Sequence, residues 1–321
     1  MIRSIIHECA MKKILSIDGG GIKGLMPAIF LEILGRCLNE PLVKTFDLVT
    51  GTSTGSVLAG AIAFPVGLDM AGVQKLYREQ GPRIFRNPRP DIVQLTKPKY
   101  RGSNLYNVLK MYFKDMRLSK AGTRFMSTAY DVFGAWDKDG NPGPVFFKSW
   151  RRNMAKVRVI DAIQASAAAP TYFPPHRVDV PWKPTQRACL YDGGLFAGNP
   201  TLTALAEAER LFPGEQFFIV SMGTGRHETV TKCRNADGLI NVATKVTGWM
   251  LDGSADTVDY IMNRIHPADA YFRFNPVLDR KVTMDDAGSD TLDYLTGVAQ
   301  LYLKNNRKRF KALCKALNNL A

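Results

Sequence analysis

The stretch "SIDGGGIKGLMPAIF", residues 16–30, joins an apolar run that ends at Ile17 to a glycine-rich turn and the start of a predicted helix. Gly19, Gly21 and Gly24 spell G-x-G-x-x-G, which is typical of the turn where a Rossmann strand meets the pyrophosphate of a dinucleotide. The N–H groups of such a turn bind an anion. The residues elsewhere in the chain must decide which anion it is.

The composition is that of a globular protein. With 321 residues, 45% of them hydrophobic, the chain can bury a large core in one or two domains. It has no run of eighteen apolar residues and no apolar signal segment in its first ten residues, which predicts a soluble, intracellular protein. Its 43 basic and 29 acidic residues give a net charge of +14. This charge favours anionic membranes, nucleic acid or anionic ligands as partners, or serves solubility alone.

Strand and helix signals alternate along the first third of the chain. We expect strands at 12–18 and 46–50, followed by helices at 24–38 and 54–64. This order is typical of a parallel sheet with helices on its faces. Further signals predict strands within 123–133, 143–150, 188–191 and 216–225, and helices at 159–169 and 201–211.

Neither repeats nor low-complexity segments divide the chain. Met11 looks like a natural start, so residues 1–10 are interpreted as an extension without a structural role and 11–321 as one domain. The prolines within 81–104 predict an irregular excursion, which could cover a binding pocket.

The five cysteines show no spacing that is typical of a metal or redox site. They are Cys9, Cys37, Cys189, Cys233 and Cys314, an odd number without C-x-x-C pairs or a His/Cys cluster. We therefore expect reduced thiols, mostly buried.

A second motif lies between the second strand and its helix. Residues 51–55 read Gly-Thr-Ser-Thr-Gly, a G-x-S-x-G pattern. In a sharp strand-to-helix turn, Gly51 and Gly55 avoid Cβ clashes and the Ser53 hydroxyl is exposed at the sheet edge as a nucleophile. The simpler alternative is that Ser53 only caps the helix.

A nucleophilic serine needs a base, and the sequence offers two kinds. His227 and His266 follow Ser53 in the order of an α/β-hydrolase triad, although His266 looks like an ordinary loop residue. Asp192 ends a short apolar strand before Gly193 and Gly194, and we expect it beside the serine at the same edge of a parallel sheet. The simpler alternative is that Asp192 only forms an Asx-type turn before the two glycines.

The glycine-rich turn then has two candidate tasks. A Rossmann site requires an acidic residue at the end of the second strand, where this chain has Ser53. Beside a serine, successive N–H groups stabilise the oxyanion of acyl transfer, at about 3 kcal/mol per donor. A non-catalytic nucleotide-binding protein that uses Gly19 to Gly24 stays open as the alternative.

Three separated blocks resemble the motifs of the patatin-like phospholipases, the plant patatins included. They are "DGGGIKG" at 18–24, "GTSTG" at 51–55 and "DGG" at 192–194. Secondary blocks follow in order along the chain: "GPRIF" at 81–85, "SAAAPTYFPP" at 166–175, "SMGTG" at 221–225 and "TMDDA" at 283–287. The main motifs fall within 14–200. Lysine at position 23 replaces the arginine common in this family.

The resemblance implies an α/β fold of three layers, a mostly parallel sheet with helices on both faces. It implies a Ser53–Asp192 dyad without a catalytic histidine, and hydrolysis of fatty acyl esters without metal or cofactor. The oxyanion hole would consist of Gly19, Gly20 and Gly21. The supporting glycines would be Gly24, Gly51, Gly55, Gly193 and Gly194.

The implied partners are an acyl-lipid membrane surface and no nucleic acid polymer. The missing plant secretory leader suggests a cytoplasmic enzyme that meets the membrane peripherally during action. Some bacterial members are anti-phage effectors switched on by a cyclic nucleotide, and the net charge of +14 would suit that activator. A homo-oligomer is a further expectation.

The carboxyl-terminal stretch 301–321 predicts a basic amphipathic helix. Its apolar positions are Leu303, Phe310, Leu313 and Leu317. Such a helix either rests on anionic lipid or, as is more common, packs this stripe on its own domain.

Overall fold

The computed structural model describes residues 11–94, 96–227 and 239–320. Residues 1–10, with Cys9 and the predicted extension, and Cys233 lie outside the described residues. The helices are α1 (Leu25–Cys37), α2 (Leu42–Thr45), α3 (Thr54–Ala63), α4 (Met70–Ile84), α5 (Asp91–Gln94), α6 (Gly102–Phe113), α7 (Val159–Ser166), α8 (Thr201–Leu211), α9 (Leu239–Ile265), α10 (Ser289–Asn305) and α11 (Arg307–Asn319). The strands are β1 (Lys12–Ile17), β2 (Leu48–Gly51), β3 (Arg124–Asp131), β4 (Gly143–Lys148), β5 (His176–Val180), β6 (Lys183–Asp192), β7 (Phe217–Met222), β8 (Arg226–His227), β9 (Tyr271–Phe274) and β10 (Val277–Leu278).

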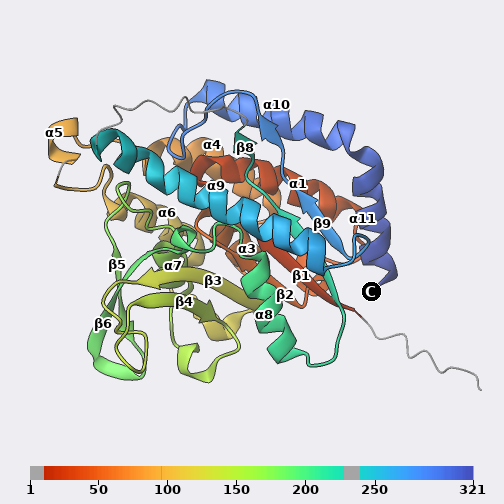
Figure 1. The fold of residues 1–321 in the computed structure, drawn as a ribbon, viewed down its shortest axis with the longest axis horizontal. Helices are drawn as coiled ribbons and strands as arrows, with labels where there is room; N and C mark the ends of the chain where they lie inside the picture. The colour runs from red at the N-terminus through yellow and green to blue at the C-terminus, as the bar shows by residue number, and fades with distance from the viewer. Residues whose placement is uncertain (1–10, 95, 228–238, 321) are drawn as a thin grey trace, which may run out of the picture.

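Eight of the described strands form one sheet in the order β5-β6-β3-β2-β1-β7-β9, with β4 paired to β3 (Figure 1). The short strands β8 and β10 pair with each other in a separate, parallel two-stranded sheet. The pairs β1–β2, β1–β7, β2–β3 and β7–β9 are parallel. The pairs β3–β4, β3–β6 and β5–β6 are antiparallel. The expected mostly parallel α/β sheet is therefore confirmed.

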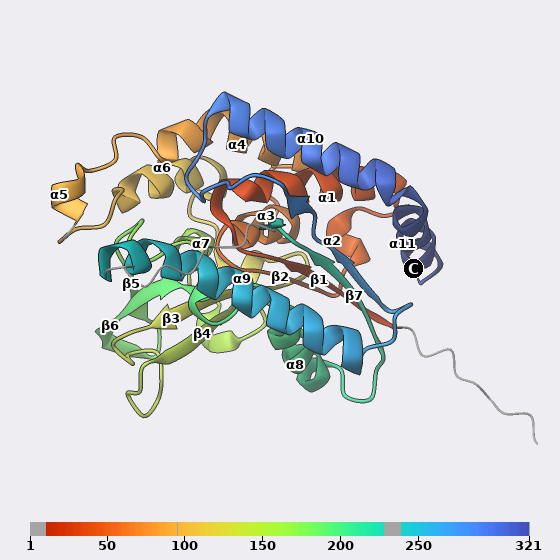
Figure 2. The same cartoon turned by 45° about the horizontal axis from the view of Figure 1, so that its top comes forward.

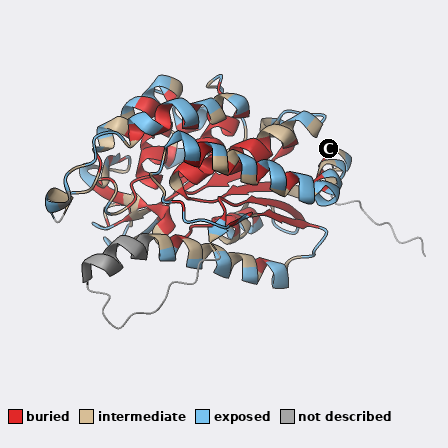
Figure 3. Ribbon diagram, turned by 90° about the horizontal axis from the view of Figure 1, so that it is seen from above, coloured by how far each residue is buried: buried red, intermediate tan, exposed pale blue. Residues whose placement is uncertain are grey.

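Alternating side chains of the central strands face two different helical layers. In β1, Leu15 and Ile17 belong to the core that includes α1, α3, α4 and α10. Ile14 instead packs with Ala204 and Ala208 of α8 and with Met262 of α9. This two-residue period is expected of a strand buried on both faces. The result is the three-layer arrangement, with its buried centre visible in Figure 3.

One sequence prediction about the end of the chain needs correction. The single helix expected within 301–321 is two helices, because α10 ends at Asn305 and α11 begins at Arg307. The apolar stripe is nevertheless buried in the protein's own core, with Phe310 7%, Leu313 0% and Leu317 1% exposed. The packing alternative is the correct one for these side chains.

The expectation of reduced thiols is wrong for Cys37 and Cys314, which form a disulfide between the end of α1 and α11. Their Cα atoms lie 6.0 Å apart although 277 positions separate them in the sequence. Only the packing of α11 beside α1 brings them together, so their spacing in the chain carried no signal. Cys189 is a free, buried thiol.

None of the helices in the described part of the chain combines the length and the apolar character needed to cross a membrane.

Candidate active site

Ser53 occupies the turn between β2 and α3 with φ 54° and ψ −123°. This backbone conformation is strained for a residue with a side chain and is typical of a nucleophile on a sharp strand-to-helix turn. The Ser53 N–H donates to Ser166 Oγ at 2.9 Å, and its carbonyl accepts from Ser56 Oγ at 2.6 Å. Both polar backbone groups are thus held by buried serines.

The glycines around Ser53 are required by close packing. A Cβ atom on Gly51 would lie 2.1 Å from the Gly55 carbonyl oxygen, and one on Gly55 would lie 2.2 Å from the Ile17 carbonyl oxygen. A Cβ on Gly24 would lie 2.3 Å from the Tyr77 hydroxyl. A side chain at Gly51 or Gly55 would push α3 away from β2 or β1 and displace the serine, and one at Gly24 would collide with α4 and the start of α3.

Asp192 is buried, 3% exposed, at the end of β6. Its Oδ1 accepts from the Gly194 N–H at 2.7 Å, while Oδ2 has no hydrogen-bond partner of ordinary geometry in the described structure. Burial raises the pKa of Asp192 to about 7, against the lowering effects of the neighbouring Ser53 hydroxyl and the Gly194 N–H. The carboxyl is therefore a much stronger base than an exposed aspartate.

The route by which Asp192 reaches the serine differs from the prediction. We expected a parallel strand, but β6 runs antiparallel to β3, with Asp192 opposite Ala129. Because Ser127 of the same β3 pairs with Gly51, Asp192 still arrives at the level of the residues that follow Gly51. A Cβ on Gly193 would lie 2.0 Å from Thr128 Oγ1, so glycine is needed for this approach.

The glycine-rich turn after β1 lies directly beside Ser53. A Cβ on Gly19 would lie 3.3 Å from Ser53 Cβ, and the Gly19 N–H donates to the Gly198 carbonyl at 2.9 Å. The N–H groups of Gly20 and Gly21 donate to no acceptor in the described structure. Gly21 has φ 60°, and a Cβ there would lie 2.2 Å from the Met284 carbonyl oxygen.

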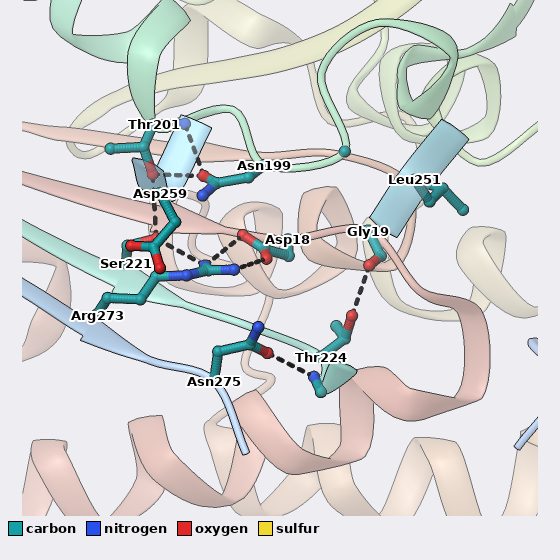
Figure 4. A network of polar contacts seen from close by, with 12 residues as sticks. Asp18, Gly19, Asn199, Thr201, Ser221, Thr224, Leu251, Asp259, Arg273 and Asn275 are labelled. Carbon is teal, nitrogen blue, oxygen red and sulfur yellow. Dashed lines mark hydrogen bonds and ion pairs between the residues drawn. The ribbon is translucent and has the colours of Figure 1, made fainter. Parts of the chain in front are cut away.

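A buried ion pair anchors the start of this turn (Figure 4). Arg273 of β9 donates to both carboxylate oxygens of Asp18, at 2.9 and 2.6 Å, and also to Ser221 Oγ at 2.8 Å. Burial raises the pKa of Asp18, and the Arg273 guanidinium opposes that rise. These hydrogen bonds of the Arg273 guanidinium fix the end of β1 relative to β7 and β9.

An apolar cavity opens beside Ser53. Its wall includes Gly21 and Ser53 at one end and side chains of α4, α6 and the segment after α7 elsewhere. The apolar and aromatic lining residues are Ile22, Val57, Leu76, Tyr77, Ile84, Phe85, Leu105, Val108, Leu109, Ala167, Ala169, Tyr172, Phe173 and Met284. Such a wall suits a hydrocarbon chain attached to a group that reacts at the serine.

A loop near the carboxyl terminus closes one side of the cavity. The Met284 carbonyl accepts from the Ile22 N–H at 2.8 Å. The next residue, Asp285, accepts from Lys99 Nζ at 2.5 Å and from the Tyr100 hydroxyl at 2.6 Å. The proline-rich segment, this loop and the glycine-rich turn are therefore joined by hydrogen bonds.

The alternative base His227 has different neighbours. Burial lowers the pKa of His227, the Lys23 charge lowers it further, and Asp252 opposes these effects. The backbone of Arg280 and of Val282 lies within hydrogen-bonding reach of the His227 ring. Its Nδ1 has no partner in the described structure. The Ser53 hydroxyl lies close enough to Asp192 to lower its pKa, whereas Ser53 is not among the groups that shift the pKa of His227.

Within the described residues, no group of three or more His, Cys, Asp or Glu side chains is arranged to hold a metal ion.

The sequence analysis missed several residues that shape the site. Arg273 could have been noticed as a lone cation in the strand "YFRF". Ser166 begins the block "SAAAPTYFPP", but no role was predicted for it, because the block alone does not show what its serine contacts. Leu251 of α9 lies over the site, where it would meet a Cβ on Gly194 at 2.3 Å. No local pattern marks Leu251, because its role depends on the packing of α9 across the sheet.

Comparisons with known proteins identify similar sequences and structures. The family model described as patatin-like phospholipase matches residues 15–205. Calcium-independent phospholipase A2-gamma of Rattus norvegicus is 28% identical over 95% of this chain and 40% of its own length. Patatin-15 of Solanum tuberosum is 30% identical over 92% of this chain and 84% of its own length.

The chain thus spans about 40% of the mammalian phospholipases that it matches. Among solved structures, human GIVD cytosolic phospholipase A2 matches 100% of this chain and 61% of its own, with a TM-score of 0.49 and 11% identity.

Proposed function

We propose that this chain, which belongs to the patatin-like phospholipase family, releases fatty acids from glycerolipids by way of a Ser53–Asp192 dyad. One observation carries the proposal: a strained serine at the N-terminus of α3 faces a buried carboxyl whose pKa is about 7, at the end of an apolar cavity. The nucleophile, the base and the cavity for the acyl chain therefore adjoin one another.

In the first step, Asp192 Oδ2 accepts the proton of the Ser53 hydroxyl while Ser53 Oγ attacks the ester carbonyl carbon. The open oxygen of Asp192 is available for this transfer, and burial gives the carboxyl the basicity that it needs. The carbonyl oxygen becomes an oxyanion, which the N–H groups of Gly20 and Gly21 stabilise. Because the Gly19 N–H donates to Gly198, Gly19 contributes through its close packing against Ser53.

In the second step, the tetrahedral intermediate collapses and the leaving alcohol takes the proton from Asp192. The acyl group stays on Ser53 Oγ, with its hydrocarbon chain in the apolar cavity. Asp192 then accepts a proton from water, which attacks the acyl carbon, and Ser53 regains its proton when the fatty acid leaves. None of these steps requires a metal or a cofactor.

A labelling experiment tests the proposal. A fluorophosphonate should label the native protein and His227→Ala, but not Ser53→Ala. In a fatty-acid release assay, Ser53→Ala and Asp192→Asn should lose activity and His227→Ala should retain it. Full activity of Asp192→Asn would rule out the dyad, and loss of activity in a folded His227→Ala would favour the Ser–Asp–His triad.

The same assays separate the remaining alternative and the finer hypotheses. A nucleotide that raises the melting temperature of a protein that does not label would favour a nucleotide-binding module. Activation of lipid hydrolysis by a cyclic nucleotide would support the regulated anti-phage effector, for which the net charge of +14 is the support. Localisation in the cytoplasm stays a prediction, and the Cys37–Cys314 disulfide argues against it, because disulfides are rare in that compartment.

A further inference from the structure

The segment that includes the end of α4, α5 and α6 is strongly basic. Residues 82–114 contain eight lysines and arginines and one aspartate. Arg83, Arg86, Lys97, Arg101 and Lys110 are exposed to solvent. Arg89 is used internally, because its guanidinium donates to the carbonyls of Pro98 and Tyr100.

Some of these basic side chains line a groove between α4 and α6. Arg83, Arg86 and Arg101 contribute to its wall together with Gln80, Asn104 and Asn107, and none of its lining residues is acidic. Val108 lines both this groove and the apolar cavity that begins at Ser53. The positive surface is therefore the outer side of the helices that enclose the acyl site.

Large apolar side chains of the same segment are exposed, and one of them, Met111, lines the groove with these arginines. Ile92 of α5 is 74% exposed and Met111 of α6 is 52% exposed. Apolar side chains among arginines are typical of surfaces that enter the interface of an anionic membrane. We name the surface made by Arg83, Arg86, Arg101, Ile92 and Met111 the α4–α6 face.

A second basic surface lies at the other end of the molecule. Helix α11 exposes Arg307, Lys308 and Lys311. It packs at the start of β1, where Lys13 Nζ donates to the Leu320 carbonyl. Figures 1 and 2 both show α5 and α11 at opposite ends of the long axis. Because Ser53 follows the carboxyl end of β2, α11 lies far from the catalytic edge.

We propose that the α4–α6 face, and not the basic helix α11, docks this protein on an anionic phospholipid bilayer. This inference rests on the proposed function, because docking there delivers a lipid to the cavity beside Ser53. Arg86 and Arg101 attract the lipid phosphates, and Ile92 and Met111 insert among the acyl chains. The positive charge of α11 is left facing away from the bilayer.

Matched charge reversals at the two ends test the inference. Arg86→Glu/Arg101→Glu should lower binding to vesicles of phosphatidylglycerol and phosphatidylcholine by about tenfold or more at 0.1 M salt. Arg307→Glu/Lys308→Glu changes the net charge by the same amount and should bind within about twofold of the native protein. Phosphatidylcholine vesicles without anionic lipid should show little difference between the two variants.

A second matched pair of variants tests the apolar side chains of the α4–α6 face. Ile92→Ser should weaken vesicle binding, whereas Leu301→Ser, at a 58% exposed position of α10, should leave it unchanged. Every variant should hydrolyse a soluble short-chain ester at the native rate, which shows that the site is intact.

The outcomes distinguish the two proposals. If the native protein hydrolyses neither the soluble ester nor the lipid, the proposed function fails. If it hydrolyses the ester but both double variants lose vesicle binding equally, docking follows net charge and the α4–α6 face is wrong. Binding of an oligonucleotide, and not of vesicles, that is lost in Arg86→Glu/Arg101→Glu would also overturn the inference in favour of nucleic acid.

Discussion

The chain contains the tripeptide Asp-Gly-Gly at 18–20 and again at 192–194, and the two aspartates have opposite environments. Each is buried, 3% exposed, and each lies near the carboxyl edge of β1 and β2. Asp18 is held on both oxygens by Arg273. Asp192 receives one backbone N–H, and its other oxygen has no hydrogen-bond partner in the described structure.

This difference shows what turns a buried carboxylate into a base. A bidentate arginine stabilises the charged form and leaves no lone pair directed at a substrate proton. Asp192 has no such cation beside it, so burial is the dominant influence and raises its pKa to about 7. One of its oxygens also stays open. Asp18 is therefore suited to hold a turn and Asp192 to move a proton.

The largest expected effect is on activity when Asp192 is replaced. Asp192→Asn removes the base while keeping the shape, so fatty-acid release should fall by about 10³-fold or more. The native activity should rise with pH and level off above about 7, where the carboxyl is ionised. Initial rates from pH 5 to 9 check this. A profile that is flat across pH 7 would contradict the assignment of the base.

The same substitution should change stability in the opposite direction. In the native state Asp192 keeps its proton up to about pH 7, whereas in an unfolded chain the carboxyl has its ordinary pKa of 3.8 and releases the proton there. The free energy of unfolding of the native protein therefore falls as pH rises from about 4 to 7. Asp192→Asn lacks this loss and should be more stable at pH 8, by up to about 4 kcal/mol.

Urea denaturation at pH 4 and pH 8 measures this difference. The two proteins should unfold at similar urea concentrations at pH 4 and separate at pH 8. Equal midpoints at both pH values would mean that burial does not penalise the ionised Asp192.

Removing the partner of Asp18 should damage folding. Arg273→Met leaves the Asp18 carboxylate buried without its cation and should cost about 3 kcal/mol of stability, as is typical when one member of a buried ion pair is lost. Asp18→Asn/Arg273→Met removes both charges and should recover part of this loss. Thermal unfolding measures both variants. A single variant as stable as the native protein would show that the ion pair does not hold the turn.

Much of the site could be predicted because its motifs follow strand ends. A G-x-S-x-G pattern between a strand and a helix predicted a sharp turn at Ser53, and the Asp-Gly-Gly block predicted Asp192 at a strand end, where the structure has both residues. The central strands β1, β2 and β7 and their helices lie within a few residues of the predicted ranges. These features depend on local periodicity and turn chemistry, which a sequence displays directly.

The missed features depend on contacts between distant segments. Arg273 is 255 positions from Asp18, and the Cys37–Cys314 disulfide spans 277. The antiparallel direction of β6 follows from its pairing with β3 and from the connection through β5, neither of which has a signal of its own in the sequence. The two Asp-Gly-Gly blocks look alike until their partners are known.

The smallest effect should come from the residues that hold the backbone of Ser53. Ser166→Ala leaves the buried Ser53 N–H without its acceptor and should cost about 1–2 kcal/mol of stability, with a modest loss of activity. Ser56→Ala is the matched control, because the Ser53 carbonyl also accepts from the Ser56 N–H at 3.0 Å and stays satisfied. Both serines are 0% exposed, so each substitution removes a fully buried hydroxyl group. If Ser56→Ala proved as damaging as Ser166→Ala, the cost would reflect the loss of a buried hydroxyl and not the support of the strained turn that directs Ser53 toward Asp192.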